Sequence, residues 1–263
     1  MTNVFPGVVE RLVRRLEEPA RAVGVADVRL GLRYAAVRLE DGRTGTAFTF
    51  LQEAHRGCSV FGGRRPLAGR PAGDLLGLLR SADSLEAAVG LACANALANV
   101  AAPDLEAGDV LERLTLGPED DVGMVGHFGP LVEPVRRRAR SLTIFERVAE
   151  PTGVLRPATE ATQVLPRCTV ALLSATSLLN GTIDGLLESA MACREVVVLG
   201  ASTPLVPEAF AGQRVTWLSG IVVTDGAGLL RAVSEGSGMG QFGPFVRKVS
   251  RRGAGPCGRG SVL

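Results

Sequence analysis

Five short apolar runs, each rich in valine, isoleucine or leucine, constrain the fold of the second half of the chain. The runs are Val122–Val125, Leu142–Phe145, Val170–Leu173, Glu195–Leu199 and Val215–Val223. Helix-compatible stretches lie between or after most of them, at 131–140, 181–192, 205–211 and 226–235. Buried strands that alternate with helices form a parallel sheet covered on both faces. The pattern therefore predicts an α/β fold with a doubly wound, mostly parallel sheet over residues 103–250.

The first part of the chain, residues 1–102, follows a different pattern and predicts a small α+β domain. Residues 6–18 carry apolar side chains at helical spacing, and residues 25–50 alternate around a turn at Asp41-Gly42, which predicts a hairpin. Two helices are expected at 73–80 and 84–101, the second with Ser84 as its N-cap. The Pro-rich stretch 151–166 is interpreted as an irregular crossing. The Gly- and Arg-rich tail 251–263 is expected to be disordered.

The predicted sheet has a crevice at the carboxyl ends of its strands. With the strand order 3-2-1-4-5, the chain reverses between strands one and four, and ligands bind outside that point. Strand one ends in the loop 126–130, strand four ends in the loop 200–205, and the loop 174–182 closes strand three on the same edge. The candidate ligand-binding side chains on these loops are Thr176, Asn180, Ser202 and Thr203. They suit the positioning of a ligand better than nucleophilic attack, because Ser202 has no GxSxG context.

The loop after the first predicted strand is the most informative local motif. Its glycines Gly123, Gly126 and Gly129 permit a tight turn and a close approach of a ligand to main-chain N–H groups, and it also carries Phe128. A helix that begins directly after the loop adds the positive end of its dipole. The GxxGxxG spacing differs from the dinucleotide fingerprint GxGxxG, and Pro130 has no N–H to offer. Two interpretations stay open: the loop contacts a ligand, or the glycines only make a tight strand–helix turn.

Few side chains of this sequence are typical of catalysis or of metal binding. His127, in the glycine loop, is the best candidate for ligand contact or acid–base work. Glu146 lies where nucleotide-binding folds place an acid for a ribose hydroxyl, about 20 residues after the loop. Both residues are also candidate metal ligands. His55 and Cys58 form an HxxC pair, but two ligands do not make a metal site.

Asn95 and Asn99 lie one turn apart on an otherwise apolar helix. Asparagine is a poor residue for a helix interior, so the pair indicates a specific polar contact. That contact is either at the seam between the two domains or with the backbone of the connector. Asn99 is therefore included among the candidate ligand-binding residues.

The composition argues against several classes of partner. The formal net charge is only +2, and the basic run Arg136–Arg138 has no aromatic platform beside it, so we expect no nucleic-acid partner. No apolar stretch reaches the roughly 18 residues of a membrane span, and we expect no membrane partner. The five cysteines are odd in number and form no CxxC pair, which favours the cytoplasm. The sequence leaves a homodimer open as the oligomeric state.

Several ordered blocks resemble the putative heavy-metal-chelation family. They include Asp121-Val-Gly-Met-Val-Gly-His-Phe-Gly-Pro-Leu131, Ala175-Thr-Ser-Leu-Leu-Asn180-Gly-Thr182 and Gly200-Ala-Ser-Thr-Pro-Leu205. The resemblance implies an enolase-N-terminal-like domain followed by a Rossmann-like domain, with a small-ligand or metal-complex site at their seam. Thr169 follows Cys168 where the family pattern has an acidic residue, so one hard metal ligand is missing.

Two functional hypotheses follow. The leading one is that the protein chelates a heavy metal, or handles a metal-containing small molecule, in the interdomain cleft, with a divalent transition metal as the implied cofactor. The rival is an enzyme that uses a nucleotide or S-adenosylmethionine-like cofactor at the same crevice, with His127 as acid or base. The sequence does not say whether turnover occurs.

Overall fold

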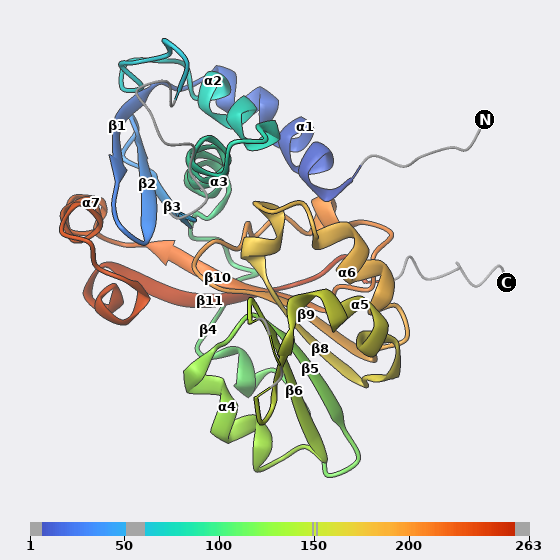
Figure 1. Cartoon of the computed structure of the whole chain (residues 1–263). Helices are drawn as coiled ribbons and strands as arrows, with labels where there is room; N and C mark the ends of the chain where they lie inside the picture. The colour runs from blue at the N-terminus through green and yellow to red at the C-terminus, as the bar shows by residue number, and fades with distance from the viewer. Residues whose placement is uncertain (1–6, 51–60, 149, 151, 256–263) are drawn as a thin grey trace, which may run out of the picture.

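The computed structural model describes residues 7–50, 61–148, 150 and 152–255 and divides them between two sheets (Figure 1). A three-stranded antiparallel sheet has the order β1-β2-β3, and an eight-stranded sheet has the order β4-β11-β10-β9-β8-β5-β6-β7. The predicted fold class is confirmed: a small α+β part precedes a large, mostly parallel sheet.

The N-terminal part consists of helices packed on one face of the small sheet. Its elements are α1 (Val8–Arg21), β1 (Val25–Leu30), β2 (Tyr34–Leu39), β3 (Thr44–Phe48), α2 (Ala72–Gly77) and α3 (Ser84–Ala98). Helix α3 is buried on nearly all sides, because α1 and α2 cover the face that does not contact β2 and β3. Its N-cap is Asp83, whose carboxylate accepts hydrogen bonds from the N–H groups of Leu85 and Glu86, so the assignment of Ser84 was wrong.

The single hairpin predicted over residues 25–50 is in fact a three-stranded meander. The turn at Gly42 is present, with φ of +88°, but a second turn at Gly31 divides residues 25–39 into β1 and β2. The Gly31 N–H bonds to the Tyr34 carbonyl at 2.9 Å. A Cβ on Gly31 would lie 2.1 Å from the Val233 carbonyl oxygen. Glycine is therefore needed there because another helix, α7, approaches the turn.

The large sheet is parallel through six strands and antiparallel at one edge. Its strands are β4 (Glu106–Ala107), β5 (Asp121–Val125), β6 (Ser141–Glu146), β7 (Leu155–Pro157), β8 (Val170–Ser174), β9 (Glu195–Leu199), β10 (Trp217–Val223) and β11 (Val246–Arg252). In the sheet order β7-β6-β5-β8-β9-β10, all neighbouring strands are parallel. Strand β11 pairs antiparallel with both β10 and β4.

The predicted strand order needs a correction, because the stretch 151–166 contains β7. Counted with β7 as the third strand, the six parallel strands have the order 3-2-1-4-5-6. The chain therefore reverses between β5 and β8, and β9 is not the neighbour of β5 as the sequence suggested. Strand β7 has only three residues and ends at Pro157, which is too short for a periodic signal.

Successive residues of a strand in the large sheet pack in different apolar clusters, one on each face of the sheet. Leu172 packs in a cluster with Leu131 of α4 (Gly129–Arg136), whereas Leu173 belongs to the cluster of α5 (Ala161–Val164) and α6 (Ile183–Ser189). Because successive side chains of a strand point to opposite faces, α4 covers one face of the sheet and α5 and α6 cover the other (Figure 1). Short 3-10 turns make further connections: Leu78–Arg80, Val110–Glu112, Ala158–Glu160, Leu165–Arg167, Ala175–Leu178, Pro207–Phe210, Met239–Gln241 and Gly243–Phe245.

Two C-terminal elements differ from their predicted roles. Helix α7 (Gly226–Ser234) covers β1 and β2 of the small sheet, where Leu229 and Val233 pack with Ala36. Strand β11 runs to Arg252, two residues into the predicted tail, and the Arg252 guanidinium lies 4.1 Å from the centre of the Trp217 ring. Residues 256–263 lie outside the described part of the chain.

The two parts share one continuous core. A single cluster of buried residues joins Leu12 and Leu91 of the N-terminal part with Leu173, Val198 and Leu218 of the large sheet. Within the described residues, Cys93, Cys168 and Cys193 are buried free thiols, as small apolar cysteines are expected to be. No described helix has both the length and the apolar composition that a bilayer span requires.

Asn99 makes the polar contact between the two parts. Its Nδ2 donates to the Thr203 carbonyl at 2.9 Å and to the Ile221 carbonyl at 3.3 Å, and its Oδ1 accepts from the Leu205 N–H at 2.8 Å. Asn95 instead donates to the Thr46 carbonyl within the N-terminal part. Of the two contacts that the sequence left open, Asn99 makes the one at the domain seam.

Replacement of Asn99 by alanine is expected to lower the free energy of unfolding by about 3 kcal/mol, because it leaves buried backbone groups of one strand, β10, and of the loop after β9 without this partner. Urea denaturation followed by circular dichroism measures the change. The matched control is Asn180→Ala, since exposed Asn180 bonds, among the described residues, only to Thr182 in its own turn, and this control should cost about 1 kcal/mol or less. Equal losses in the two variants would contradict the role given to Asn99.

Candidate functional site

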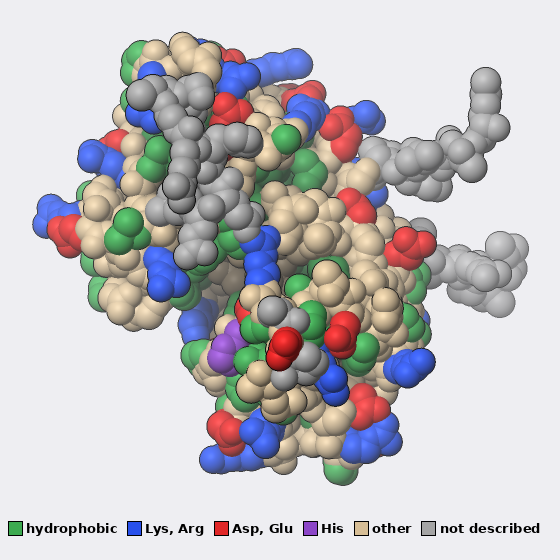
Figure 2. Space-filling model, viewed as in Figure 1, with side chains coloured by type: hydrophobic (Ala, Val, Ile, Leu, Met, Phe, Trp, Pro, Cys, Tyr) green, Lys and Arg blue, Asp and Glu red, His purple; other side chains and the backbone are tan. Residues whose placement is uncertain are grey.

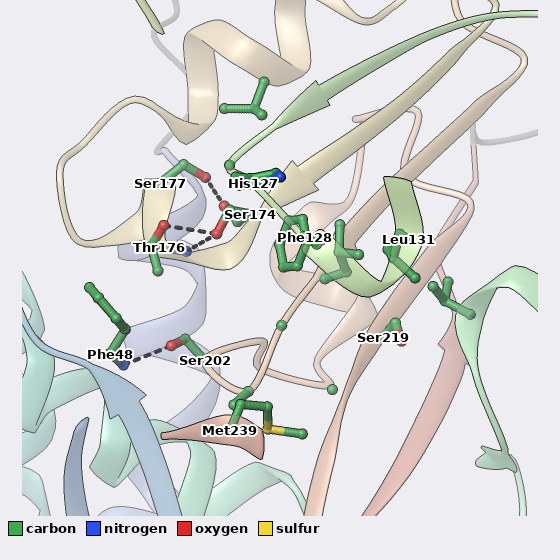
Figure 3. A pocket seen from close by; sticks show the side chains of 18 of the residues that line it. Phe48, His127, Phe128, Leu131, Ser174, Thr176, Ser177, Ser202, Ser219 and Met239 are labelled. Atoms are coloured by element: carbon green, nitrogen blue, oxygen red, sulfur yellow. Dashed lines mark hydrogen bonds between the residues drawn. The ribbon is translucent and has the colours of Figure 1, made fainter. Parts of the chain in front are cut away.

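A cavity of about 1030 Å³ lies between the small sheet and the carboxyl ends of the parallel strands. Figure 2 shows the surface hollowed where the two parts of the molecule meet. The N-terminal part contributes Arg33, Tyr34, Phe48 and Phe50 to the lining. The loops after β5, β6, β8 and β9 form the opposite wall (Figure 3). The site therefore needs both parts of the chain.

The glycine loop after β5 is one wall of this cavity. Gly126 has φ of +90°, and a Cβ there would lie 2.9 Å from the Cβ of Ser174 on β8. The Phe128 ring lies beside Gly126 and also beside Gly200, which has φ of +117°. Glycine at both positions lets the ring pack between the two loops. The structure confirms that the glycines make a tight strand–helix turn. It also places the loop at the cavity, and contact between the loop and a ligand stays a prediction.

Glu146 holds the glycine loop in place. Its Oε2 accepts a hydrogen bond from the His127 N–H at 2.9 Å, and its Oε1 accepts one from the Arg147 N–H at 2.8 Å. The carboxylate thus ties the end of β6 to the loop after β5. The imidazole of His127 is exposed at the cavity wall. The two candidate metal ligands are neighbours, but one of them already accepts two backbone hydrogen bonds.

Hydroxyl groups gather at the end of β8 (Figure 3). Ser174 Oγ and Thr176 Oγ1 are 2.8 Å apart, and Ser177 Oγ donates to the Ser174 carbonyl at 2.6 Å. Ser202, on the loop after β9, accepts a hydrogen bond from the Phe48 N–H at 2.8 Å and so links the large sheet to β3. All four of these residues line the cavity.

The charged groups of the lining are few and mostly paired. Lys248 Nζ lies 3.3 Å from Asp109 Oδ2. The Arg147 guanidinium lies 4.4 Å from the centre of the Phe50 ring and so joins the two parts of the chain beside the cavity. Burial raises the pKa of Tyr34 to about 12, although the nearby Arg33 charge acts in the opposite direction. Tyr34 is therefore a neutral phenol at physiological pH and not a base.

Three predicted residues do not line the cavity. Gly123 lies inside β5, where a Cβ would be 2.7 Å from Leu165, so its role is close packing of a helix on the sheet. Thr203 and Asn99 are buried at the seam between the two parts. Asn99 donates to the Thr203 carbonyl and so holds the loop after β9 in place. The others among the predicted ligand-binding residues do line it: Gly126, His127, Phe128, Glu146, Thr176, Asn180 and Ser202.

The described residues contain no group of three or more His, Cys, Asp or Glu side chains that could hold a metal ion. Burial raises the pKa of both Cys168 and Cys193 to about 11, so these thiols stay protonated at neutral pH and are poor metal ligands. His55 and Cys58 lie outside the described residues.

The sequence interpretation missed the contribution of the N-terminal part to the site. Arg33, Tyr34, Phe48 and Phe50 flank the ends of β2 and β3, and no local motif marks them. The aromatic side chains carried the signal that could have found them, because Phe48 ends β3 and Phe50 follows two residues later in a chain with few aromatics.

Comparison with known proteins agrees with this architecture. Residues 109–252 match the model of a family described as putative heavy-metal chelation, and residues 13–98 match a second model with the same description. The chain belongs to this family. A protein of unknown function from Pyrococcus horikoshii, from the same family, has a TM-score of 0.82 at 22% identity, over 93% of this chain and 99% of that one. A second family structure, from Desulfitobacterium hafniense, has a TM-score of 0.74 at 23% identity, over 91% and 98%.

An uncharacterized protein of Methanocaldococcus jannaschii is 27% identical over 231 residues, which cover 84% of this chain and 87% of that protein. The family resemblance inferred from the sequence is thus confirmed. These relatives agree with the fold and with the family, and their names state no ligand.

The Gly126→Ala variant is expected to lose about 2 kcal/mol of stability, because alanine is strained at positive φ and its Cβ would press on Ser174. Thermal or urea unfolding measures this loss. The control is Gly129→Ala in the same loop, where a Cβ meets nothing within 4 Å and helix propensity favours alanine. If the two variants are equally stable, the close contact between the loops after β5 and β8 is wrong.

Proposed function

We propose that this protein binds a small organic chelator, or the metal complex of one, in the cavity between its two parts. The metal is held by the donor atoms of the ligand, and the protein binds the ligand around it. The observation that carries the proposal is a large cavity lined by hydroxyls, aromatic rings and a few charges, with no three His, Cys, Asp or Glu side chains of the described residues grouped so that they could hold a metal ion. The family description, putative heavy-metal chelation, supports a role in metal handling.

Direct chelation by side chains is less well supported. A protein site for a transition metal needs about three or four ligands with suitable geometry. At the cavity wall, the His127 imidazole has no hydrogen-bond partner among the described residues, but Glu146 already accepts two backbone hydrogen bonds. The size of the cavity also favours an organic ligand, because pockets for small molecules have volumes of roughly 300–1,000 Å³. A bare metal ion would leave nearly all of this space unfilled.

The direct test compares metal salts with metal complexes. Isothermal titration calorimetry under reducing conditions is run with nickel, cobalt, zinc, copper and iron salts, and then with the nickel complex of nitrilotriacetate. We expect the complex to bind with a stoichiometry near one, and the salts alone to show no stoichiometric binding. The buried free thiols favour a cytoplasmic protein, so reducing conditions match the expected environment.

The His127→Ala variant distinguishes coordination of the metal by protein side chains from coordination by a bound organic chelator. Loss of stoichiometric binding of a bare metal in His127→Ala would contradict the proposal and establish direct coordination. Retention of complex binding in this variant is the expected result. The absence of any binding of metal complexes by the unaltered protein would also reject the proposal.

A nucleotide- or S-adenosylmethionine-dependent enzyme is the second candidate, and one observation favours it. The strand order 3-2-1-4-5-6 is that of dinucleotide-binding sheets, and the Gly126 loop lies at the reversal point between β5 and β8. His127 would then serve as acid or base. A ligand at 100 times its Kd stabilises the folded state by about 2.7 kcal/mol, so a thermal upshift with S-adenosylmethionine or ATP would support this candidate. An unchanged melting temperature at millimolar concentrations of both would reject it.

A further inference from the structure

We propose that the cavity selects ligands that carry an anionic group, a carboxylate or a phosphate, and that Ser202 and one hydroxyl of the Ser174–Thr176 pair donate hydrogen bonds to it. The inference rests on the proposed function, because it names the chemical class of the molecule bound in the same cavity. It depends on the balance of hydrogen-bond donors, acceptors and charges in the lining.

Ser202 supplies the first donor. Its side chain is almost fully buried, with 3% exposure, and it lines the cavity. The oxygen accepts the hydrogen bond from the Phe48 N–H, but no described residue accepts the hydroxyl proton of Ser202. Since a serine hydroxyl can donate one hydrogen bond, this donor is available to a ligand.

The Ser174–Thr176 pair supplies a second donor (Figure 3). The two hydroxyl oxygens are 2.8 Å apart, so one hydroxyl donates to the other. Only one of the two protons is used in this contact. Among the described residues no acceptor takes the other proton, which is left at the cavity wall. Ser177 is not part of this set, because its proton goes to the Ser174 carbonyl.

Backbone donors lie beside these hydroxyls. Gly200 adopts φ of +117°, and the next two residues, Ala201 and Ser202, line the cavity. Within the described part of the chain, no group accepts a hydrogen bond from the N–H of either residue. Successive backbone N–H groups of this kind form concave binding sites for anions.

The charged side chains of the lining also favour an anionic ligand. The two acids, Glu146 and Asp109, are already satisfied: Glu146 accepts from two backbone N–H groups, and Asp109 accepts from the Leu111 N–H and pairs with Lys248. Arg33 also lines the cavity, and no ion pair to it is present among the described residues. Unused donors and an unpaired cation favour an anionic ligand, whereas a cationic ligand would leave these donors without acceptors.

The experiment uses two nickel complexes of opposite charge. Nickel nitrilotriacetate is an anion with carboxylate groups, and the nickel complex of triethylenetetramine is a cation. Calorimetry on the unaltered protein is expected to give at least about tenfold tighter binding of the anionic complex, and inorganic phosphate should compete with it. Equal affinities for the two complexes, with no competition by phosphate, would overturn the anion site and leave chelate binding intact.

Three variants test the residues. Thr176→Val keeps the side-chain shape and is expected to weaken binding of nickel nitrilotriacetate about 10- to 100-fold, as is Ser202→Ala. The control Ser189→Ala removes a hydroxyl that bonds only to the Gly185 carbonyl of its own helix, and it should bind as the unaltered protein does. Melting temperatures verify folding, and Thr176→Val decides the result if Ser202→Ala is destabilised through its bond to Phe48.

The outcomes separate this inference from the proposed function. Unchanged affinity in Thr176→Val would reject the anion site, whatever the two complexes do. If phosphate binds and Thr176→Val weakens it, but neither nickel complex binds, the anion site stands and the proposed function fails. If neither the complexes nor phosphate bind, both are wrong.

Discussion

The cavity exists because the buried amide of Asn99 and a shared apolar core fix the two parts of the chain against each other. Asn99 follows the last turn of α3 and bonds to the backbone on both sides of the loop after β9, at Thr203 and Leu205, and also to Ile221 in β10. The apolar cluster that surrounds α3 continues into the large sheet. A hinge between the two parts would have to break buried hydrogen bonds and open this core, which makes a fixed site more favourable than a closing one.

This fixed seam supports the proposal that hydroxyl groups and backbone amides form the binding site. Two contacts hold the loop after β9 in place: the hydrogen bonds to the Asn99 side chain at the seam, and the bond from the Phe48 N–H to Ser202 at the cavity. The loop after β5 is held by the Glu146 carboxylate. Donors held in place in this way lose little entropy on binding, so neutral hydroxyls and backbone amides can select a ligand. The acids of the cavity act mainly as supports, which agrees with a ligand that brings its own metal.

The sequence predicted the parts of the fold that have a periodic signal. The buried runs of β5, β6, β8, β9 and β10 were located because valine-rich strands between helices leave a clear pattern. Strand β7 was missed because three residues ending at Pro157 have no periodicity, and that omission displaced the predicted reversal point by one strand. Strand β11 was missed because a strand that contains Arg247, Lys248, Arg251 and Arg252 resembles a solvated tail, and its outer neighbour β4 has only two residues. The loops of the large sheet that line the cavity could be predicted from the sequence, but the contribution of Arg33, Phe48 and Phe50 depends on packing between distant segments.

The central claim is that the ligand, and not the protein, coordinates the metal. A crystal structure of the protein with nickel nitrilotriacetate, with anomalous data collected at the nickel edge, tests this most directly. The account predicts a nickel peak inside the cavity, with a ligand carboxylate against Ser202 and Thr176 and no protein atom at bonding distance from the metal. A nickel ion bonded directly to the His127 imidazole, or a nickel peak only outside the cavity, would contradict it.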